Sequence, residues 1–170
     1  MGFQKLPRPV YFCNCGDHAW SALTKGFVTL VSPEDTHFLQ DRAWTAIDSK
    51  QKTRPVYARS TYLRLHREIM KAPKKLVVDH WNGNGVDNRR PNLRISTVKQ
   101  NSQNSRGHRD SSSKFKGVCW VTNMEIWLSQ ICIDDIRTII GYFDDEVEAA
   151  KAYDAAALKL FGPYARLNFP

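Results

Sequence analysis

The chain has 170 residues with 42% hydrophobic content, which allows one ordinary domain or two small ones, each with a core. No stretch approaches the length of a membrane span, and the N-terminus has no apolar core of the signal-peptide type. We therefore expect an intracellular protein that is neither secreted nor held in a membrane. Its four cysteines indicate free thiols or a metal site, because disulfide frameworks are typical of secreted chains.

The net charge of +8 is unevenly distributed along the chain. Residues 51–110 carry about +10, whereas residues 1–50 are near neutral and residues 111–170 carry about −2. Positive charge gathered in one segment is typical of a protein that binds a polyanion such as a nucleic acid. The alternative is a basic surface that is only solvated.

Residues 1–60 give the weakest signals in the chain. Short β-prone runs predict strands over residues 10–12, 26–31 and 55–59. A helix is predicted to begin at Pro33 and to reach Trp44. We expect a small sheet with one helix that supports the next segment, with Trp20 and Trp44 in its core.

A cysteine- and histidine-rich turn lies inside this lobe. Cys13, Cys15 and His18 are three zinc-capable side chains, and Gly16 allows a tight turn among them. A structural zinc ion normally takes four ligands, usually as two separated pairs. No second pair is evident, since His37 is the one nearby candidate and the other two cysteines lie in the C-terminal third. Two interpretations stay open: a structural Zn2+ site, and ordinary thiols beside a surface histidine.

Residues 61–70 have the spacing of an amphipathic helix, which Pro73 terminates. This predicted helix carries His66. A packed, hydrogen-bonded histidine fits the pattern as well as one that orients a site or touches a phosphate. We therefore assign His66 no catalytic role.

The most informative stretch runs over residues 76–104. An apolar run leads directly to Asp79 and His80, and an Asn-Gly-Asn-Gly turn follows at residues 82–85. Neighbours in a strand point to opposite faces, so Asp79 and His80 share one site only if the strand ends or twists there. The turn that follows permits this.

A second short strand is predicted over residues 93–96, and Thr97 then opens a short polar helix. Asn101 and Asn104 are three residues apart, so a helix places them on one face. Asp79 offers a carboxylate oxygen and Asn101 an amide oxygen, which are ligands that a hard cation prefers. Neutral His80 can take a proton from water near pH 7. This combination has the groups that metal-assisted hydrolysis of a phosphodiester needs. The alternative is an ordinary Asp-His pair followed by an Asn-rich turn.

Residues 62–106 resemble the HNH endonuclease motif in its His-Asn-Asn variant, which is found in phage and intron-encoded homing endonucleases. The resemblance implies a ββα-metal module in which His80 is the general base. It also implies that Asp79 and Asn101 complete the catalytic set and bind one Mg2+ or Mn2+ ion per active site.

The same resemblance gives Asn92 and Asn104 supporting roles. Asn92 ties the loop together, and Asn104 supports the helix end or lines the site. The implied reaction is cleavage of double-stranded DNA in the cytoplasm or nucleoid of a bacterial or phage-infected cell. One site cuts one strand, so a monomer would nick and a homodimer would cut both strands.

Residues 102–113 are Ser-rich, polar and basic, and we expect a linker over residues 106–113. Arg106 and Arg109 are candidates for contacts to backbone phosphates. A flexible tether without such contacts is the alternative.

The C-terminal third predicts a sheet followed by one helix. The expected strands cover residues 115–121, 126–133 and 137–143. The helix is predicted to begin at Asp144 or Asp145, because Glu148 follows Asp145 in capping-box spacing. Gly162 ends this helix.

This segment, residues 114–170, resembles the Apetala-two/ethylene-response-factor (AP2/ERF) DNA-binding domain. The resemblance rests on Lys116-Gly117-Val118, Trp127, Gly141-Tyr142-Phe143, the EAAKAYDAAALKLFG helix and Leu167-Asn168-Phe169-Pro170. It implies a three-stranded antiparallel sheet that is packed on one helix and lies in the major groove of DNA.

The candidate DNA contacts of this segment are polar or aromatic side chains of the predicted strands: Lys116, Trp120, Gln130 and Arg137. Other positions depart from the family pattern of Arg and Trp contacts. They are Cys119, Val121, Cys132 and Ile139. The alternative is a module that only packs or contacts protein.

Together these patterns predict an α+β protein in four parts. They are a β-rich lobe with a small sheet (1–60), an HNH nuclease module (61–105), a linker (106–113) and an AP2/ERF-type DNA-binding domain (114–170). The predicted function is a metal-dependent DNA endonuclease of the homing type. One alternative is a non-catalytic, sequence-specific DNA-binding regulator. Another is an RNA- or protein-binding accessory factor built round a zinc-bound N-terminal lobe.

Overall fold

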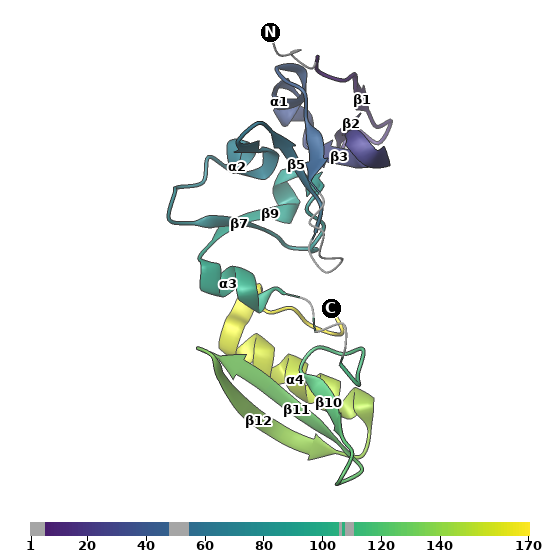
Figure 1. Ribbon diagram of the computed structural model, residues 1–170, viewed down its shortest axis with the longest axis vertical. Helices are drawn as coiled ribbons and strands as arrows, with labels where there is room; N and C mark the ends of the chain where they lie inside the picture. Colours follow the sequence, from purple (N-terminus) through teal and green to yellow (C-terminus); the bar gives the residue numbers. More distant parts are fainter. Residues whose placement is uncertain (1–5, 48–54, 106, 108–110) are drawn as a thin grey trace. The chain divides into compact units, whose positions relative to one another are not determined.

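The computed structural model describes residues 6–47, 55–105, 107 and 111–170. The chain divides into two compact units, residues 1–101 and 102–170. Each unit combines strands with helices, so the chain is α+β, as the sequence predicts (Figure 1). Within the described ranges, no helix has the length and apolar character needed to cross a bilayer.

A four-stranded sheet in the order β1-β2-β3-β8 forms one part of the first unit. Its strands are β1 (Val10–Phe12), β2 (Ala19–Ala22), β3 (Val28–Val31) and β8 (Asp87–Asn88). The first three strands are antiparallel neighbours, whereas β8 pairs with β3 in parallel and places Asn88 beside Val31. This pairing brings a segment from the middle of the chain to the N-terminal sheet.

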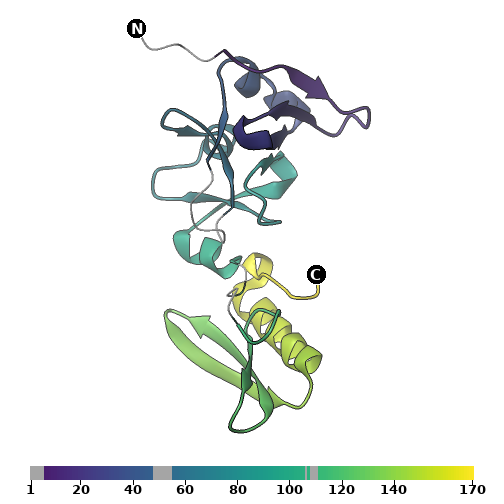
Figure 2. The same cartoon turned by 45° about the vertical axis from the view of Figure 1, so that its right-hand side comes forward.

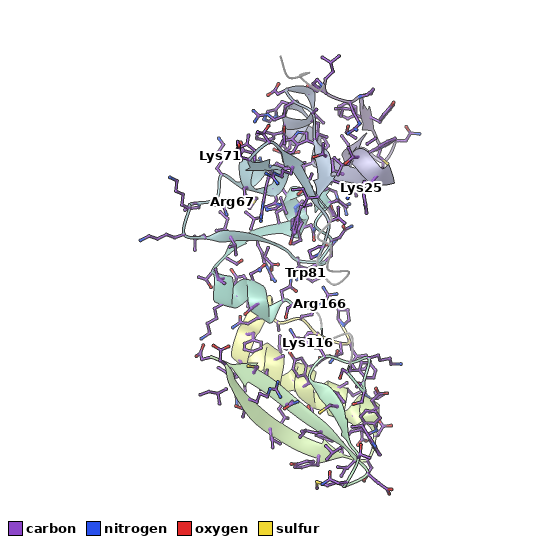
Figure 3. The ribbon with its side chains drawn as sticks, viewed as in Figure 1. Lys25, Arg67, Lys71, Trp81, Lys116 and Arg166 are labelled. Atoms are coloured by element: carbon purple, nitrogen blue, oxygen red, sulfur yellow. The ribbon has the colours of Figure 1, made fainter. Side chains whose placement is uncertain are left out.

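A three-stranded antiparallel sheet, β4-β5-β6, and two short helices form another part. The elements are β4 (Thr45–Ile47), β5 (Tyr57–Ser60), β6 (Leu63–Arg64), α1 (His37–Gln40), α2 (Leu65–Met70), and the 3-10 turns η1 (Thr24–Gly26) and η2 (Pro33–Asp35). Arg67 of α2 donates to the carbonyl oxygens of Leu76 and Ala72 at 2.8 and 3.0 Å (Figure 3). These bonds hold the chain that leads into the next strand.

A two-stranded antiparallel sheet and a helix complete this unit. They are β7 (Val77–His80), β9 (Leu93–Ser96) and α3 (Val98–Gln103), with η3 (Arg90–Asn92) before β9. Thr97 and Gln100 form a capping box at the start of α3, with N···O distances of 2.9 and 3.2 Å. The boundary between the two units falls within α3.

One hydrophobic core serves all three sheets of the first unit. Its buried members include Ala19, Val31, Leu39, Trp44, Ala46, Ala58, Leu65, Ile69, Val78 and Leu93. Because β7, β9 and α2 all contribute to it, the positions of Asp79 and His80 on β7 are fixed by packing on one side of the strand.

The second unit is a three-stranded antiparallel sheet with a helix along one face (Figure 2). Its elements are β10 (Val118–Val121), β11 (Ile126–Ile133), β12 (Ile136–Phe143), α4 (Glu146–Phe161) and η4 (Gly162–Tyr164). Asp145 caps α4 by accepting from the Glu148 amide at 2.9 Å, as predicted. Small residues of α4 (Ala149, Ala150 and Ala157) let the helix pack closely on the sheet.

Three local predictions for the first unit are wrong. The helix predicted over residues 61–70 begins only at Leu65, because residues 63–64 pair with β5 as β6. The helix predicted to reach Trp44 stops at Gln40, and the chain then turns into β4. Trp20 is only partly buried and lies outside the hydrophobic core, and its ring stacks on Tyr11 at a centroid distance of 4.5 Å.

Candidate active site

β7 presents Asp79 and His80 at its last two positions. Asp79 is paired across the sheet with Arg94, and its Oδ2 lies 2.7 Å from both Nε and Nη2 of Arg94. Asp79 is 5% exposed, and charge-assisted bonds of this length hold its carboxylate in one orientation. His80 is the next residue along the strand, so it points to the other face.

His80 ends a chain of buried hydrogen bonds. Its Nε2 lies 3.2 Å from Asn88 Oδ1, and Asn88 Nδ2 lies 2.8 Å from Thr29 Oγ1. Thr29 Oγ1 in turn lies 3.0 Å from the carbonyl oxygen of Val86. Asn88 and Thr29 are fully buried. We call these four residues the relay.

The direction of the relay follows from its last member. A carbonyl oxygen can only accept, so Thr29 donates to Val86 and accepts from the Asn88 amide nitrogen. Asn88 therefore presents its oxygen to His80, and His80 Nε2 must donate. In the neutral ring the lone pair then lies on Nδ1, which is the atom that can accept a proton.

Burial lowers the pKa of His80 below its ordinary value, because a buried site disfavours the charged ring. The bond to Asn88 and the charges of Asp79 and Asp87 act in the opposite direction. The ring is therefore neutral at pH 7, and the negative charges of Asp79 and Asp87 would stabilise the imidazolium if the ring took up a proton.

A second imidazole, that of His66, packs beside His80. The two rings meet edge to face with centroids 5.0 Å apart, and Tyr57 lies 5.3 and 5.7 Å from His66 and His80. Burial, followed by the charge of His80, lowers the pKa of His66 to about 3. Its Nδ1 is buried and has no hydrogen-bond partner among the described residues. His66 is thus a neutral ring whose unsatisfied nitrogen lies in the same buried cluster.

The loop after β7 is held by its own polar side chains. Asn92 accepts from the Asn82 amide at 3.0 Å and donates to the Asp87 carbonyl oxygen at 2.8 Å. Asp87 also binds the Arg89 guanidinium at 2.7 and 2.8 Å. Burial raises the pKa of Asp87, but the Arg89 interactions outweigh it and the net pKa is lowered. These hydrogen bonds hold the segment that carries Asn88 in one conformation.

Gly85 lets this loop approach β5 closely. A Cβ atom at Gly85 would lie 2.4 Å from the Val56 carbonyl oxygen and 2.7 Å from the ring of Tyr57. No side chain larger than hydrogen fits there without a shift. The position of Tyr57 against both histidines depends on this contact.

Asn101 lies on α3 with an exposed side chain. Asn104 is buried but follows the end of α3 and belongs to the second unit. The prediction that one helix carries both residues is therefore wrong, because α3 stops at Gln103. Asp79 and His80 are neighbours at the end of β7 with side chains on opposite faces, and Asn92 holds the loop that follows them.

The candidate DNA contacts of the second unit divide between two faces of its sheet. Gln130 pairs with Ile139, and Cys132 pairs with Arg137. Ser129 and Ile131 are buried on the side of α4, so the alternation of the strand places Gln130 and Arg137 on the outer face. That face also carries Cys119, Val121 and Ile139 and so has little charge.

Trp120 and Lys116 do not lie on the outer face of the sheet. Trp120 pairs with Trp127, which packs on the core beneath α4, and their rings lie 5.0 Å apart. Lys116 donates to the Gln103 carbonyl oxygen at 2.6 Å, and burial together with Arg166 lowers the pKa of Lys116 to about 8 (Figure 3). Neither side chain shares the outer face with Arg137. Arg106 and Arg109 fall outside the described residues.

Cys13, Cys15 and His18 do converge. Their ligand atoms all lie within 4.8 Å of one another, at the turn between β1 and β2. His37 is not part of this group, since its Nδ1 lies 3.0 Å from the Glu34 carbonyl oxygen.

Sequence reasoning missed Asn88 and Thr29 and left His66 unassigned. Thr29 and Asn88 are 59 residues apart, and no periodicity links them. The one available signal was compositional: Asn88 follows Asp87 at the end of an Asn-rich turn, where an amide is easily taken for a turn former.

Comparison with known proteins supports the resemblance of this chain to HNH endonucleases. Residues 71–103 match the family model described as HNH endonuclease. An uncharacterized HNH endonuclease of Acanthamoeba polyphaga mimivirus is 32% identical over 112 residues, which are 62% of this chain and 57% of the relative. The resemblance to HNH endonucleases is therefore confirmed.

Plant proteins match as well. Dehydration-responsive element-binding protein 2D of Arabidopsis thaliana is 35% identical over 88 residues, 51% of this chain and 42% of its own length. APETALA2-like protein 2 of Oryza sativa subsp. japonica is 39% identical over 64 residues, 38% of this chain and 15% of its own length. These matches confirm the AP2/ERF resemblance. The chain spans little more than half the length of the mimivirus relative and less of the plant relatives. No solved structure matches it.

Proposed function

We propose that this chain is a metal-dependent DNA endonuclease of the HNH homing type, which hydrolyses phosphodiester bonds in double-stranded DNA. The observation that carries the proposal is the relay, because it fixes the ring of a neutral, buried imidazole at the residue that directly follows the buried carboxylate of Asp79. The match of residues 71–103 to HNH endonucleases supports the same chemistry.

His80 acts as the general base. Its Nδ1 takes a proton from the attacking water, while Nε2 keeps its bond to Asn88 and holds the ring in place. The imidazolium that forms is stabilised by the charges of Asp79 and Asp87, which favour the protonated ring. His66 packs against this ring as a neutral group, since its own pKa is about 3.

Asp79 and Asn101 are the proposed ligands of one Mg2+ or Mn2+ ion. Their donor atoms are oxygens, which suits a hard cation that keeps several waters. Arg94 fixes the Asp79 carboxylate in advance through Oδ2. The ion would supply charge stabilisation to the phosphate and to the leaving 3′ oxygen. In this proposal β7, β9 and α3 form the ββα-metal module, and Asn92 braces its loop.

Docking on DNA is assigned to the basic middle of the chain and to the second unit. Residues 51–110 carry about +10, which favours a phosphate backbone. Gln130 and Arg137 on the outer face of the sheet are the proposed groove contacts, and Arg106 and Arg109 the proposed phosphate contacts. The nuclease would act inside the cell, nicking as a monomer or cutting both strands as a homodimer.

A non-catalytic DNA-binding regulator is the rival function. It draws on the plant relatives, one of which is named an element-binding protein. It differs from the nuclease in one respect: it predicts DNA binding without cleavage under any metal.

The test is incubation of supercoiled plasmid with the protein and Mg2+ or Mn2+, beside EDTA and an Asp79→Asn variant. Conversion to open circle that EDTA and Asp79→Asn both abolish is expected, and a linear product would indicate paired sites. Thermal unfolding of Asp79→Asn is measured in parallel, since the substitution removes the negative charge that pairs with Arg94. Binding without metal-dependent cleavage, on plasmid and on genomic DNA, would favour the regulator.

A further inference from the structure

The turn between β1 and β2 gathers three soft metal ligands. The Sγ atoms of Cys13 and Cys15 lie 2.8 Å apart, and Cys15 Sγ lies 3.5 Å from His18 Nδ1. Cys13 is partly buried and Cys15 is exposed, and all four cysteines of the chain are free thiols. Two thiols and one imidazole within 4.8 Å are the donor types that zinc selects.

The backbone holds these ligands in advance of any ion. The Cys13 amide donates to the His18 carbonyl oxygen at 3.0 Å, which continues the β1–β2 ladder by one step. Residues that face each other in an antiparallel pair point to the same side, so Cys13 and His18 are directed together. The Gly16 amide closes a turn onto the Cys13 carbonyl oxygen at 3.0 Å, and the φ of Gly16 is +76°. That turn folds Cys15 back between the other two.

Arg89 lies within electrostatic range of the turn. The hydrogen bond with Asp87 is the main cause of the raised pKa of Arg89, and the charges of Asp17 and Cys15 contribute less. The hydrogen bond between the two thiols lowers the pKa of Cys15, whereas the charge of Asp17 acts in the opposite direction. The order of the sheet explains this proximity: Ala19 pairs with Val31, and Val31 pairs with Asn88, the residue before Arg89.

We propose that Cys13, Cys15 and His18 bind one zinc ion through three protein ligands, with the fourth position open to solvent. The site differs in chemistry from the proposed nuclease centre, which has oxygen donors. The bound ion ties the ends of the β1–β2 turn together in the four-stranded sheet, whose opposite edge strand, β8, holds Asn88. Its expected effect is on the stability of the first unit, and it takes no part in the cleavage step.

The test uses the full chain under a thiol reductant that does not bind zinc, with excess Mg2+ present to fill oxygen sites. Zinc content is measured by a metallochromic dye after gel filtration. The charge-transfer and d–d bands of the Co2+-loaded protein report the thiolate ligands directly. The variants are Cys13→Ser and His18→Ala, and Cys132→Ser is the matched control, since Cys132 is an exposed thiol of the second unit.

We expect one equivalent of zinc and cobalt–thiolate bands in the unsubstituted chain and in Cys132→Ser, with both lost in Cys13→Ser. Zinc should raise the midpoint temperature of the first unfolding transition of Cys132→Ser and leave that of His18→Ala unchanged. Circular dichroism checks that each variant folds. Zinc retained by Cys13→Ser, or no equivalent of zinc in the unsubstituted chain, would overturn the proposal. Both results are independent of DNA cleavage.

Discussion

The two units of this chain bury very different groups. Among the described residues, the first unit buries carboxylates and imidazoles: Asp35, His66, Asp79, His80 and Asp87. The second unit buries alanine, valine, isoleucine and tyrosine side chains between a sheet and a helix, and its buried polar residues are Asn104, Ser113 and Ser129. Burying charged or titratable groups costs free energy unless they are paired, whereas burying apolar groups stabilises the fold.

This difference in buried groups distinguishes the first unit, which holds the candidate active site, from the second unit. Asp35, Asp79 and Asp87 each have an arginine partner, so their burial is offset by ion pairs. Burial instead lowers the pKa values of His66 and His80 and favours their neutral rings. Burying two neutral histidines, one of them hydrogen-bonded within the relay, costs folding free energy. Buried titratable groups with shifted pKa values cluster at catalytic sites. Among the described residues of the second unit, no carboxylate or imidazole is buried in this way.

The largest effect short of the base itself is expected at Asn88. Asn88→Ala leaves the His80 ring without its acceptor, and cleavage should fall about 10- to 100-fold, as for other groups that orient a functional imidazole. Thr29→Val, which keeps the side-chain shape, should give a smaller loss in the same direction. Single-turnover cleavage rates measure both.

Asn123→Ala is the matched control for Asn88, since Asn123 is an exposed amide of the second unit. It should cleave like the unsubstituted chain. Equal rates for Asn88→Ala and Asn123→Ala would show that the relay does not serve catalysis.

Two glycine substitutions separate the stabilities of the units. Gly85→Ala forces a contact of 2.4 Å with the Val56 carbonyl oxygen and should cost the first unit about 1–3 kcal/mol. Gly117→Ala would place its Cβ 2.0 Å from the Tyr153 ring at a φ of +80° and should destabilise the second unit. Thermal unfolding followed by cleavage and DNA-binding assays distinguishes them. Loss of cleavage is expected for Gly85→Ala, and loss of binding for Gly117→Ala.

Acid should destabilise the first unit through His66. The folded pKa of His66 is about 3, below the ordinary value near 6.5, so the unfolded chain binds more protons between these values. The free energy of unfolding therefore falls as the pH drops through this window, by at most about 1.4 kcal/mol per pH unit. His66→Phe should flatten this slope in urea unfolding curves collected across the window.

His37→Gln is the control for the acid effect, because His37 is exposed on α1. It should keep the slope of the unsubstituted chain. If His66→Phe left the slope unchanged, the burial of a neutral His66 would be contradicted.

The smallest effect is expected on the outer face of the second sheet. Arg137→Ala should weaken DNA binding slightly and lower its salt dependence slightly, because the variant loses a proposed groove contact and one positive charge from the DNA-binding face. Titrations at several salt concentrations measure this. Lys151→Ala, on the opposite side of the unit in α4, serves as the control and should change neither value.

Local signals predicted much of the fold. The strands of the second unit, the Asp145 cap and the Thr97 cap each depend on residues within a few positions of one another, and all were found. The Asp79–His80 pair was also found at a strand end. Periodicity and capping carry information over a few turns of chain, which is the range of these elements.

Long-range contacts were not predicted, because periodicity and capping carry no information over such distances along the chain. The pairing of β3 with β8 and the bond between Thr29 and Asn88 join segments nearly 60 residues apart. The contact of His66 with His80 likewise depends on how α2 packs against β7. No local pattern encodes these contacts, so the sequence indicated a catalytic histidine without the groups that orient it.

The most direct test of this account is the single-turnover cleavage rate of His80→Ala on DNA that it binds as tightly as the unsubstituted chain. Equilibrium binding is measured by fluorescence anisotropy at the same salt concentration. Loss of a general base should slow cleavage about 100- to 10,000-fold while binding stays unchanged. Cleavage by His80→Ala within a few-fold of the unsubstituted rate would contradict the assignment of His80 as the base.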